Sequence, residues 1–169
     1  MAVVTLVGSL VMDGLDDVPK SLADPGQAGG KVKCWIDTVE VGAADTVAST
    51  YLMARLPSNA IILPASTLYW DDLTTTGSPT MDVGVYNMTG KSDFTDDADA
   101  LSNGHDVSSA GSGALITQGA SISSYGQPIW DHIGSVTADP KTDVDIKVVL
   151  ADANVVGGGT MSVVIYYTE

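Results

Sequence analysis

Two histidines, His105 and His132, are the side chains of this chain best suited to exchange protons near neutral pH. A catalytic triad would have to draw on one of them. The sequence contains neither a G-x-S-x-G nucleophile motif nor a phosphate-binding G-x-x-x-x-G-K-[ST] loop. His132 follows Asp131 in a predicted strand, where adjacent side chains point to opposite faces, so the two do not form an acid–base pair. We therefore predict no catalytic residue and no enzymatic activity.

A cluster of carboxylates, Asp93, Asp96, Asp97 and Asp99, invites interpretation as a calcium site. The cluster lacks the spacing of an EF-hand loop, which also needs a glutamate at its twelfth position. Carboxylates in the first turn of a helix are stabilised by the free N–H groups there and need no metal. We therefore predict no bound metal ion and no cofactor.

Three tryptophans, Trp35, Trp70 and Trp130, are spread along the chain. They could line a sugar-binding face, although isolated tryptophans pack more commonly in cores or interfaces. The single cysteine, Cys34, excludes an intrachain disulfide. It shares an apolar phase with Val32 and Ile36, and this phase predicts a buried structural thiol.

The charge balance excludes several classes of partner. The chain has 21 acidic and seven basic residues and a formal net charge of −14. Nucleic-acid binding needs clustered lysine and arginine, and anionic membranes make the same demand, so we expect neither partner. The start of the chain is apolar but has no basic segment typical of a signal peptide, and it is too short to span a bilayer.

Strand patterns dominate the rest of the sequence. The stretch Val47–Met88 alternates apolar and polar residues, with turn residues every eight to twelve positions, which is typical of an antiparallel sandwich or barrel. Lys31–Val41 reads as a strand with a bulge near Asp37. Val144–Leu150 and Met161–Tyr167 read as a hairpin closed by Gly157–Gly159. Weaker strands are expected at Leu115–Thr117 and Ile129–Ile133. The total of about eight strands predicts an all-β, jelly-roll-like sandwich.

One short helix is expected in a loop of this sandwich. Ser92 or Asp93 would cap it, and Gly104 would end it after Asn103. A Ser/Gly loop would follow over residues 106–113.

The first 30 residues differ from the remainder. A nearly continuous apolar run over residues 3–11 is followed by repeated Gly, Pro and Asp. We expect an N-terminal arm and linker, residues 1–30, and a β-sandwich domain, residues 31–169. The apolar run either docks on a partner or forms a first strand of the domain, and the sequence leaves both alternatives open.

Several passages resemble the capsid decoration proteins, also called cement proteins, of tailed bacteriophages. The similar passages are YLMARLPSNAIIL, TMDVGVYN, the acidic insert DDADALSNG and the closing GGGTMSVVIYYTE. The resemblance covers about Val32–Glu169 and leaves the arm unmatched. It implies a jelly-roll-like fold and a homotrimer on the exterior of the virion, where it bridges major capsid protein subunits. The residues expected to contact a partner are apolar or aromatic: Val3, Val4, Leu6, Val7, Leu10, Tyr51, Tyr69 and Trp70.

Two other functions compete with this one. A receptor- or glycan-binding β-module of a phage fibre would use the tryptophans and the loop at residues 118–127. A cupin-type enzyme would need several histidines and a glutamate as metal ligands, and two distant histidines do not supply them.

Overall fold

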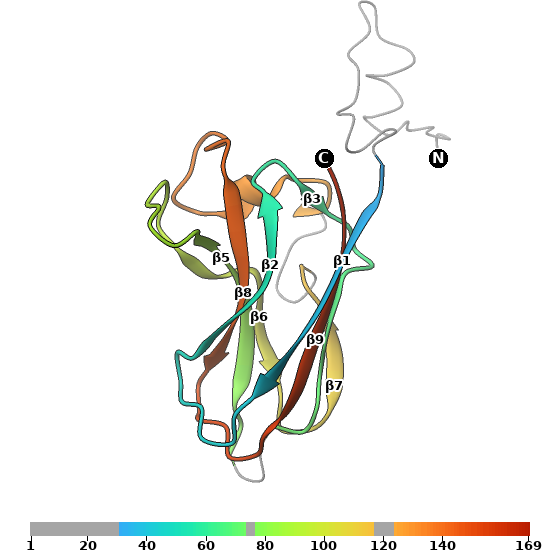
Figure 1. Ribbon diagram of the computed structural model, residues 1–169, viewed down its shortest axis with the longest axis vertical. Coiled ribbons are helices and arrows are strands. Elements are labelled where there is room, and N and C mark those ends of the chain that lie inside the picture. Colours follow the sequence, from blue (N-terminus) through green and yellow to red (C-terminus); the bar gives the residue numbers. More distant parts are fainter. Residues whose placement is uncertain (1–30, 74–76, 117–123) are drawn as a thin grey trace, which may run out of the picture.

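The computed structural model describes residues 31–73, 77–116 and 124–169. Within these ranges the chain forms two antiparallel β-sheets that pack face to face (Figure 1). The predicted N-terminal arm, residues 1–30, lies outside the described residues, as does most of the predicted loop at residues 118–127.

The strand order is that of a jelly roll. The first sheet has the order β1-β9-β4-β7, with the short β3 beside β9, and the second has the order β2-β8-β5-β6. The chain crosses repeatedly between the sheets, as it does in a double Greek key. The prediction of an all-β sandwich is therefore confirmed. The strands are β1 (Lys33–Val41), β2 (Thr50–Pro57), β3 (Ile61–Ile62), β4 (Thr67–Trp70), β5 (Thr80–Asn87), β6 (Asp97–Asp106), β7 (Gly111–Ala114), β8 (Asp143–Ala151) and β9 (Gly159–Thr168).

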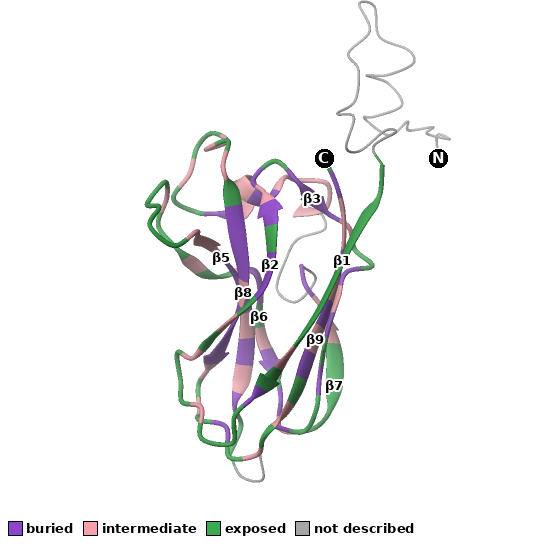
Figure 2. Cartoon of the chain, viewed as in Figure 1, coloured by how far each residue is buried: buried purple, intermediate pink, exposed green. Residues whose placement is uncertain are grey.

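The core lies between the two sheets and is built by strict alternation along β8 and β9. The fully buried side chains of these strands are Val144, Ile146, Val148 and Leu150 in β8 and Met161, Val163 and Ile165 in β9. Figure 2 shows buried residues along both strands. The two strands are not a hairpin, because β8 pairs with β2 and β5 whereas β9 pairs with β1, β3 and β4. Their apolar faces therefore point to a shared core from opposite sheets, and residues 152–158 cross between the sheets.

The bulge predicted in the first strand is located in the second strand instead. β1 pairs with β9 without interruption from Lys33–Tyr167 to Val41–Gly159. The register shift lies between Leu52 and Ala54 of β2. It leaves Leu52 half exposed and buries both Met53 and Ala54, two adjacent residues that a regular strand would point to opposite faces.

This register also corrects the prediction for Cys34. Val41 is fully buried, and a strand without a bulge gives Trp35 and Val39 the same inward phase. Cys34 and Ile36 therefore point outward, and both are exposed. The predicted buried thiol is wrong because the apolar residues of β1 occupy both of its faces.

The predicted helix over residues 93–103 is also wrong. Residues 97–106 form the edge strand β6, which pairs with β5 through two register shifts. Conversely, the strand expected at Ile129–Ile133 is a short 3-10 helix, η3 (Ile129–His132). Part of the expected Ser/Gly loop forms β7, which pairs with β4. In each case pairing with a distant strand outweighs the local propensity.

One histidine lies inside this core. His105 in β6 is 2% exposed, its Nε2 atom lies 2.8 Å from the Ser102 hydroxyl, and its ring lies 5.5 Å from the Trp70 ring. Burial lowers the pKa of His105, because the low-dielectric core disfavours the charged imidazolium. Burial lowers the pKa of His132 as well, although the negative charge of Asp131 partly opposes this effect.

A tight contact between β5 and β6 gives a test of the packing. A Cβ atom on Gly84 would lie 2.3 Å from the carbonyl oxygen of Asp97 and 2.5 Å from that of Ala98. Both atoms belong to the backbone, so the strands must separate. We expect Gly84→Ala to lower the free energy of unfolding by about 1–3 kcal/mol in urea titration. Gly134→Ala is the matched control, because a Cβ atom there would lie 3.9 Å from the Asp97 carboxylate, an ordinary van der Waals distance. Equal stability of the two variants would contradict the described β5–β6 contact.

The buried histidines predict a loss of stability in mild acid. The unfolded chain takes up protons on histidine below its ordinary pKa of about 6.5, whereas folded His105 and His132 resist protonation. The unfolding free energy should therefore be greatest above this pH and fall between pH 7.5 and 6.0. The limit for each histidine is about 1.4 kcal/mol per pH unit. Urea titrations at the two pH values measure this fall in unfolding free energy. His105→Gln should make the fall smaller, and the double variant with His132→Gln should make it smaller still. An unchanged slope in the double variant would refute the assignment.

Candidate interaction surface

The histidines do not assemble a catalytic site in the described part of the chain. The partners of His105 are the Ser102 hydroxyl and the Trp70 ring, and it is buried. His132 lies in η3, a different element from β6, which carries His105. Each histidine therefore behaves as a structural side chain.

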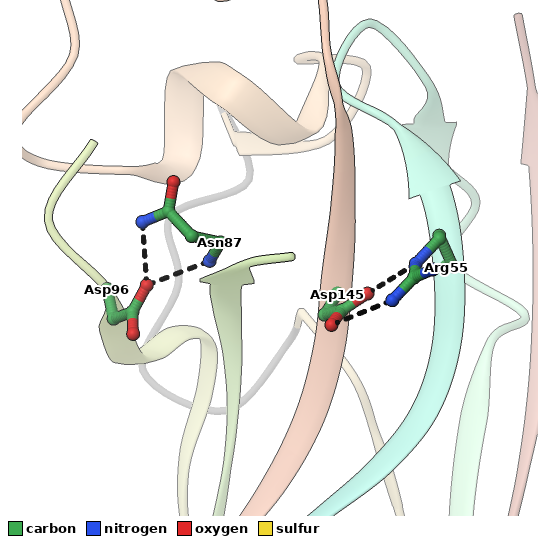
Figure 3. A network of polar contacts seen from close by, with 4 residues as sticks. All are labelled: Arg55, Asn87, Asp96 and Asp145. Atoms are coloured by element: carbon green, nitrogen blue, oxygen red, sulfur yellow. Dashed lines mark hydrogen bonds and ion pairs between the residues drawn. The ribbon is translucent and has the colours of Figure 1, made fainter. Parts of the chain in front are cut away.

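The predicted acidic cluster organises a loop and a strand. Asn87 donates two hydrogen bonds to the Asp96 carboxylate, one from its backbone N–H and one from its side-chain amide, each at 2.8 Å (Figure 3). The Asn87 side chain also accepts a hydrogen bond from the backbone N–H of Asp93 at 2.8 Å. In β6, the hydrogen bonds that the Asp99 carboxylate accepts from the Asn103 side chain and from the Asp97 carboxyl lower the pKa of Asp99. These contacts explain the aspartates as partners of the protein's own polar groups.

Within residues 31–73, 77–116 and 124–169, no group of three or more histidine, cysteine, aspartate or glutamate residues has the arrangement to hold a metal ion. No helix in the described residues has both the length and the apolar character to cross a bilayer.

The outer face of the second sheet is charged. We call the outer side of β2, β5 and β8 the charged face; it carries Arg55, Asp82, Tyr86, Asp143, Asp145 and Lys147, of which Asp145 is only 2% exposed. Arg55 donates two hydrogen bonds to Asp145, at 2.7 and 3.2 Å (Figure 3), and these bonds hold the pKa of Arg55 above its ordinary value. The Lys147 ammonium lies 4.7 Å from the centre of the Tyr86 ring.

Excess acid surrounds this charged face. Burial raises the pKa of Tyr86, and so do the charges of Asp96, Asp82, Asp97 and Asp99. Burial also raises the pKa of Asp82, with contributions from Asp99 and Asp152. The second sheet therefore presents a surface that binds water and ions readily and resists burial against an apolar partner.

The outer face of the first sheet differs from it in kind. We call this surface the uncharged face; it comprises Cys34, Ile36, Thr38, Thr67, Tyr69, Ser112, Ala114, Ser162, Val164 and Tyr166. Pairing places these side chains in cross-strand rows, such as Ile36–Val164–Thr67–Ala114. The Thr38 and Ser162 hydroxyls lie 2.8 Å apart, which confirms that they share this face. None of these ten side chains carries a formal charge, in a chain with a net charge of −14. The face ends at the next row, where Glu40 pairs with Thr160 and Asp71 accepts hydrogen bonds from Thr160.

The residues predicted to contact a partner fall in three environments. Tyr69 is 48% exposed near the centre of the uncharged face. Tyr51 is half-buried and donates a hydrogen bond from its hydroxyl to Asp45 at 2.5 Å. Trp70 is 9% exposed, and its indole N–H donates to the Ser109 carbonyl oxygen at 2.9 Å, so little of this side chain is open to a partner. The five arm residues, Val3, Val4, Leu6, Val7 and Leu10, lie outside the described residues.

A second apolar feature is a groove of about 340 Å³ between β1 and β2, at one side of the sandwich. We call it the edge groove; its lining is Trp35, Asp37, Leu52, Met53, Ala54 and Arg55. The Trp35 indole N–H donates to the Met53 carbonyl oxygen at 2.8 Å and so joins the edges of the two sheets. The sequence pattern gave no signal for this groove, because it depends on which strands become the edges.

The three tryptophans do not form one aromatic platform. Trp35 lines the edge groove, Trp70 packs in the core beside His105, and Trp130 lies in η3. The arrangement of the described residues therefore gives no support to a sugar-binding face made from all three.

Comparisons with known proteins place the fold. Neither a protein-family model nor a curated protein sequence matches the chain. Among solved structures, the chain is similar to one from the capsid of Ralstonia phage GP4, with 20% sequence identity, a TM-score of 0.55 and coverage of 83% of this chain and 85% of that one. It is also similar to a chain of the cyanophage Pam1 capsid asymmetric unit, with 22% identity, a TM-score of 0.52 and coverage of 93% and 99%. At this level of identity the likeness shows a shared fold, and both proteins with that fold come from phage capsids.

Proposed function

We propose that this protein is a virion structural protein that decorates the outside of an icosahedral phage capsid and stabilises contacts between major capsid subunits. Its partners are the major capsid protein and further copies of itself, in a homotrimer. Its function requires no turnover, no cofactor, no nucleic acid and no membrane.

The observation that carries the proposal is the contrast between the two outer faces of the sandwich. The uncharged face exposes Ile36 at 68% and Tyr69 at 48%. Burying these ten side chains removes apolar area from water, and none of them has a charge to desolvate, so association centred on them is favourable. The charged face would lose the hydration of its carboxylates on burial, which makes it suitable for permanent contact with solvent.

The comparisons support the same proposal. Both solved structures belong to phage capsids, and the likeness to the Pam1 chain spans nearly all of both chains. The shared fold therefore extends over the sandwich as a whole.

The proposed mechanism is mechanical. A protein seated across the boundary between two capsid subunits buries area on each of them. Separating the subunits then requires breaking these contacts too, which raises the barrier to rupture under the pressure of packaged DNA. Stable protein interfaces bury about 800 Å² on each partner. A net negative exterior also keeps particles apart and repels released DNA.

Tyr69 gives the direct test of the binding surface. We expect Tyr69→Asp to weaken binding to undecorated shells at least tenfold, because the change removes an aromatic contact and places a charge against the partner. Saturation binding to shells assembled from the major capsid protein of the same phage measures the affinity. The heat resistance that wild-type protein confers on the shells should decrease in parallel.

Val156→Asp is the matched control. Val156 is 51% exposed, so this substitution also exchanges an exposed apolar side chain for a carboxylate. Val156 lies in the connection between β8 and β9, outside the uncharged face. It should bind and protect shells as the wild type does. Equal binding by both variants would remove the uncharged face from the proposal. Specific binding to glycans without binding to shells would support the receptor-binding alternative.

A further inference from the structure

The first sheet has an unpaired edge at β1. All nine residues of this strand pair with β9 in one continuous register, and no other strand pairs with β1 among the described residues. The opposite edge of β1 borders the edge groove, where the Trp35 side chain reaches the Met53 carbonyl oxygen. Such an edge presents free N–H and C=O groups to an incoming strand.

The other outer strands are protected against such an addition. β2 carries a register shift between Leu52 and Ala54, and β6 carries two. β7 has only four residues. Bulges and short edge strands protect against unwanted pairing, and β1 has neither; its charged residues, Lys33, Asp37 and Glu40, are the protection that this edge does carry.

Apolar side chains flank both sides of the β1 edge. Of the seven large hydrophobic residues described as exposed, four lie at this edge: Val32, Trp35 and Ile36 on or next to β1, and Leu52 across the groove. An added strand would therefore contact apolar groups with both of its faces. Ile36 would lie beside one face, and Trp35 and Leu52 would lie beside the other.

Residues 3–11 of this chain match that requirement. The segment VVTLVGSLV has nine residues, as β1 does, and contains no charge. Its apolar residues are nearly continuous, a pattern typical of a strand that is buried on both faces. The described part of the chain begins at Lys31, two positions before β1, so the segment is tethered at one end of the edge that it would occupy.

The length of the tether favours exchange between copies. Residues 12–32 link the segment to β1, and a connection of this length is uncommon within a compact domain, where loops beyond about 12–15 residues are rare. A flexible chain of this length spans about 25 Å, enough to reach an adjacent copy. We propose that residues 3–11 of one copy pair with β1 of a neighbouring copy as an additional strand of its first sheet. Repeated head-to-tail, this exchange closes into a ring and gives the homotrimer a physical basis. The inference rests on the homotrimer of the proposed function, but it requires no shell, so its failure is distinguishable from a failure to bind shells.

Cys34 makes the inference testable in the full-length protein. It is the single cysteine, it lies on β1 and it is exposed. Each residue from Val3 to Val11 is replaced singly by cysteine, and the proteins are oxidised and separated on non-reducing gels. In one fixed register only the position opposite Cys34, and at most its same-face neighbours two residues away, lies within disulfide reach. Cross-links to Cys34 should therefore form at one such position or at adjacent positions of one parity, and they should join two molecules.

Cys34→Ala in the same variants is the control and should abolish the products that depend on Cys34. Cross-links within a single molecule, cross-links of equal yield at neighbouring positions of both parities, or no cross-links at all would each overturn the proposal.

Light scattering provides a second measurement. The wild type should have a mass three times that of the chain, and the double change Leu6→Asp and Leu10→Asp should reduce it to a single chain while the β-sandwich stays folded. Leu15→Asp, in the tether, should leave the mass of the assembly unchanged. A wild-type monomer, or a trimer that survives the double change, would contradict strand exchange.

Discussion

The pairing of β1 with β9 is the interaction on which the rest of the structure depends. Its register runs unbroken over nine residues and fixes the direction of every side chain in β1. Trp35 is thereby placed over the edge groove, and Cys34 and Ile36 are placed on the outer face. A shift by one residue would reverse these directions, since side chains alternate along a strand. Both the uncharged face and the edge groove therefore follow from one register.

The surface of this sandwich combines two opposed requirements. A net charge of −14 keeps the molecule soluble, whereas ten uncharged side chains on one outer face and an open apolar edge favour association. The fold separates these requirements in space. The charged face holds its carboxylates in ion pairs and hydrogen bonds, as Arg55 and Asp145 illustrate, while the first sheet keeps charge away from its centre. A molecule with this asymmetry is suited to adhere on one side and face solvent on the other.

The central strands could be predicted from the sequence because their apolar and polar residues alternate regularly. The edge strands could not be predicted. The sequence pattern predicts which alternate residues of Val144–Leu150 and Met161–Ile165 point into the core, and both predictions are correct. Their partners were not predictable, because a glycine turn permits either a hairpin or a crossing to the other sheet. The β6 segment was mistaken for a helix because its aspartates resemble a capped first turn, whereas Asp96 accepts its hydrogen bonds from Asn87. The orientation of Cys34 could not be predicted, because the apolar residues of β1 lie on both faces.

The central claim is that the uncharged face is covered in the assembled particle and the charged face is not. Hydroxyl-radical footprinting of free and shell-bound protein measures this by residue. Tyr69 and Tyr166 report on the uncharged face, and Tyr86 reports on the charged face. The account predicts strong protection of Tyr69 and Tyr166 on the shell with the oxidation of Tyr86 unchanged. Protection of Tyr86 with continued oxidation of Tyr69 would contradict it.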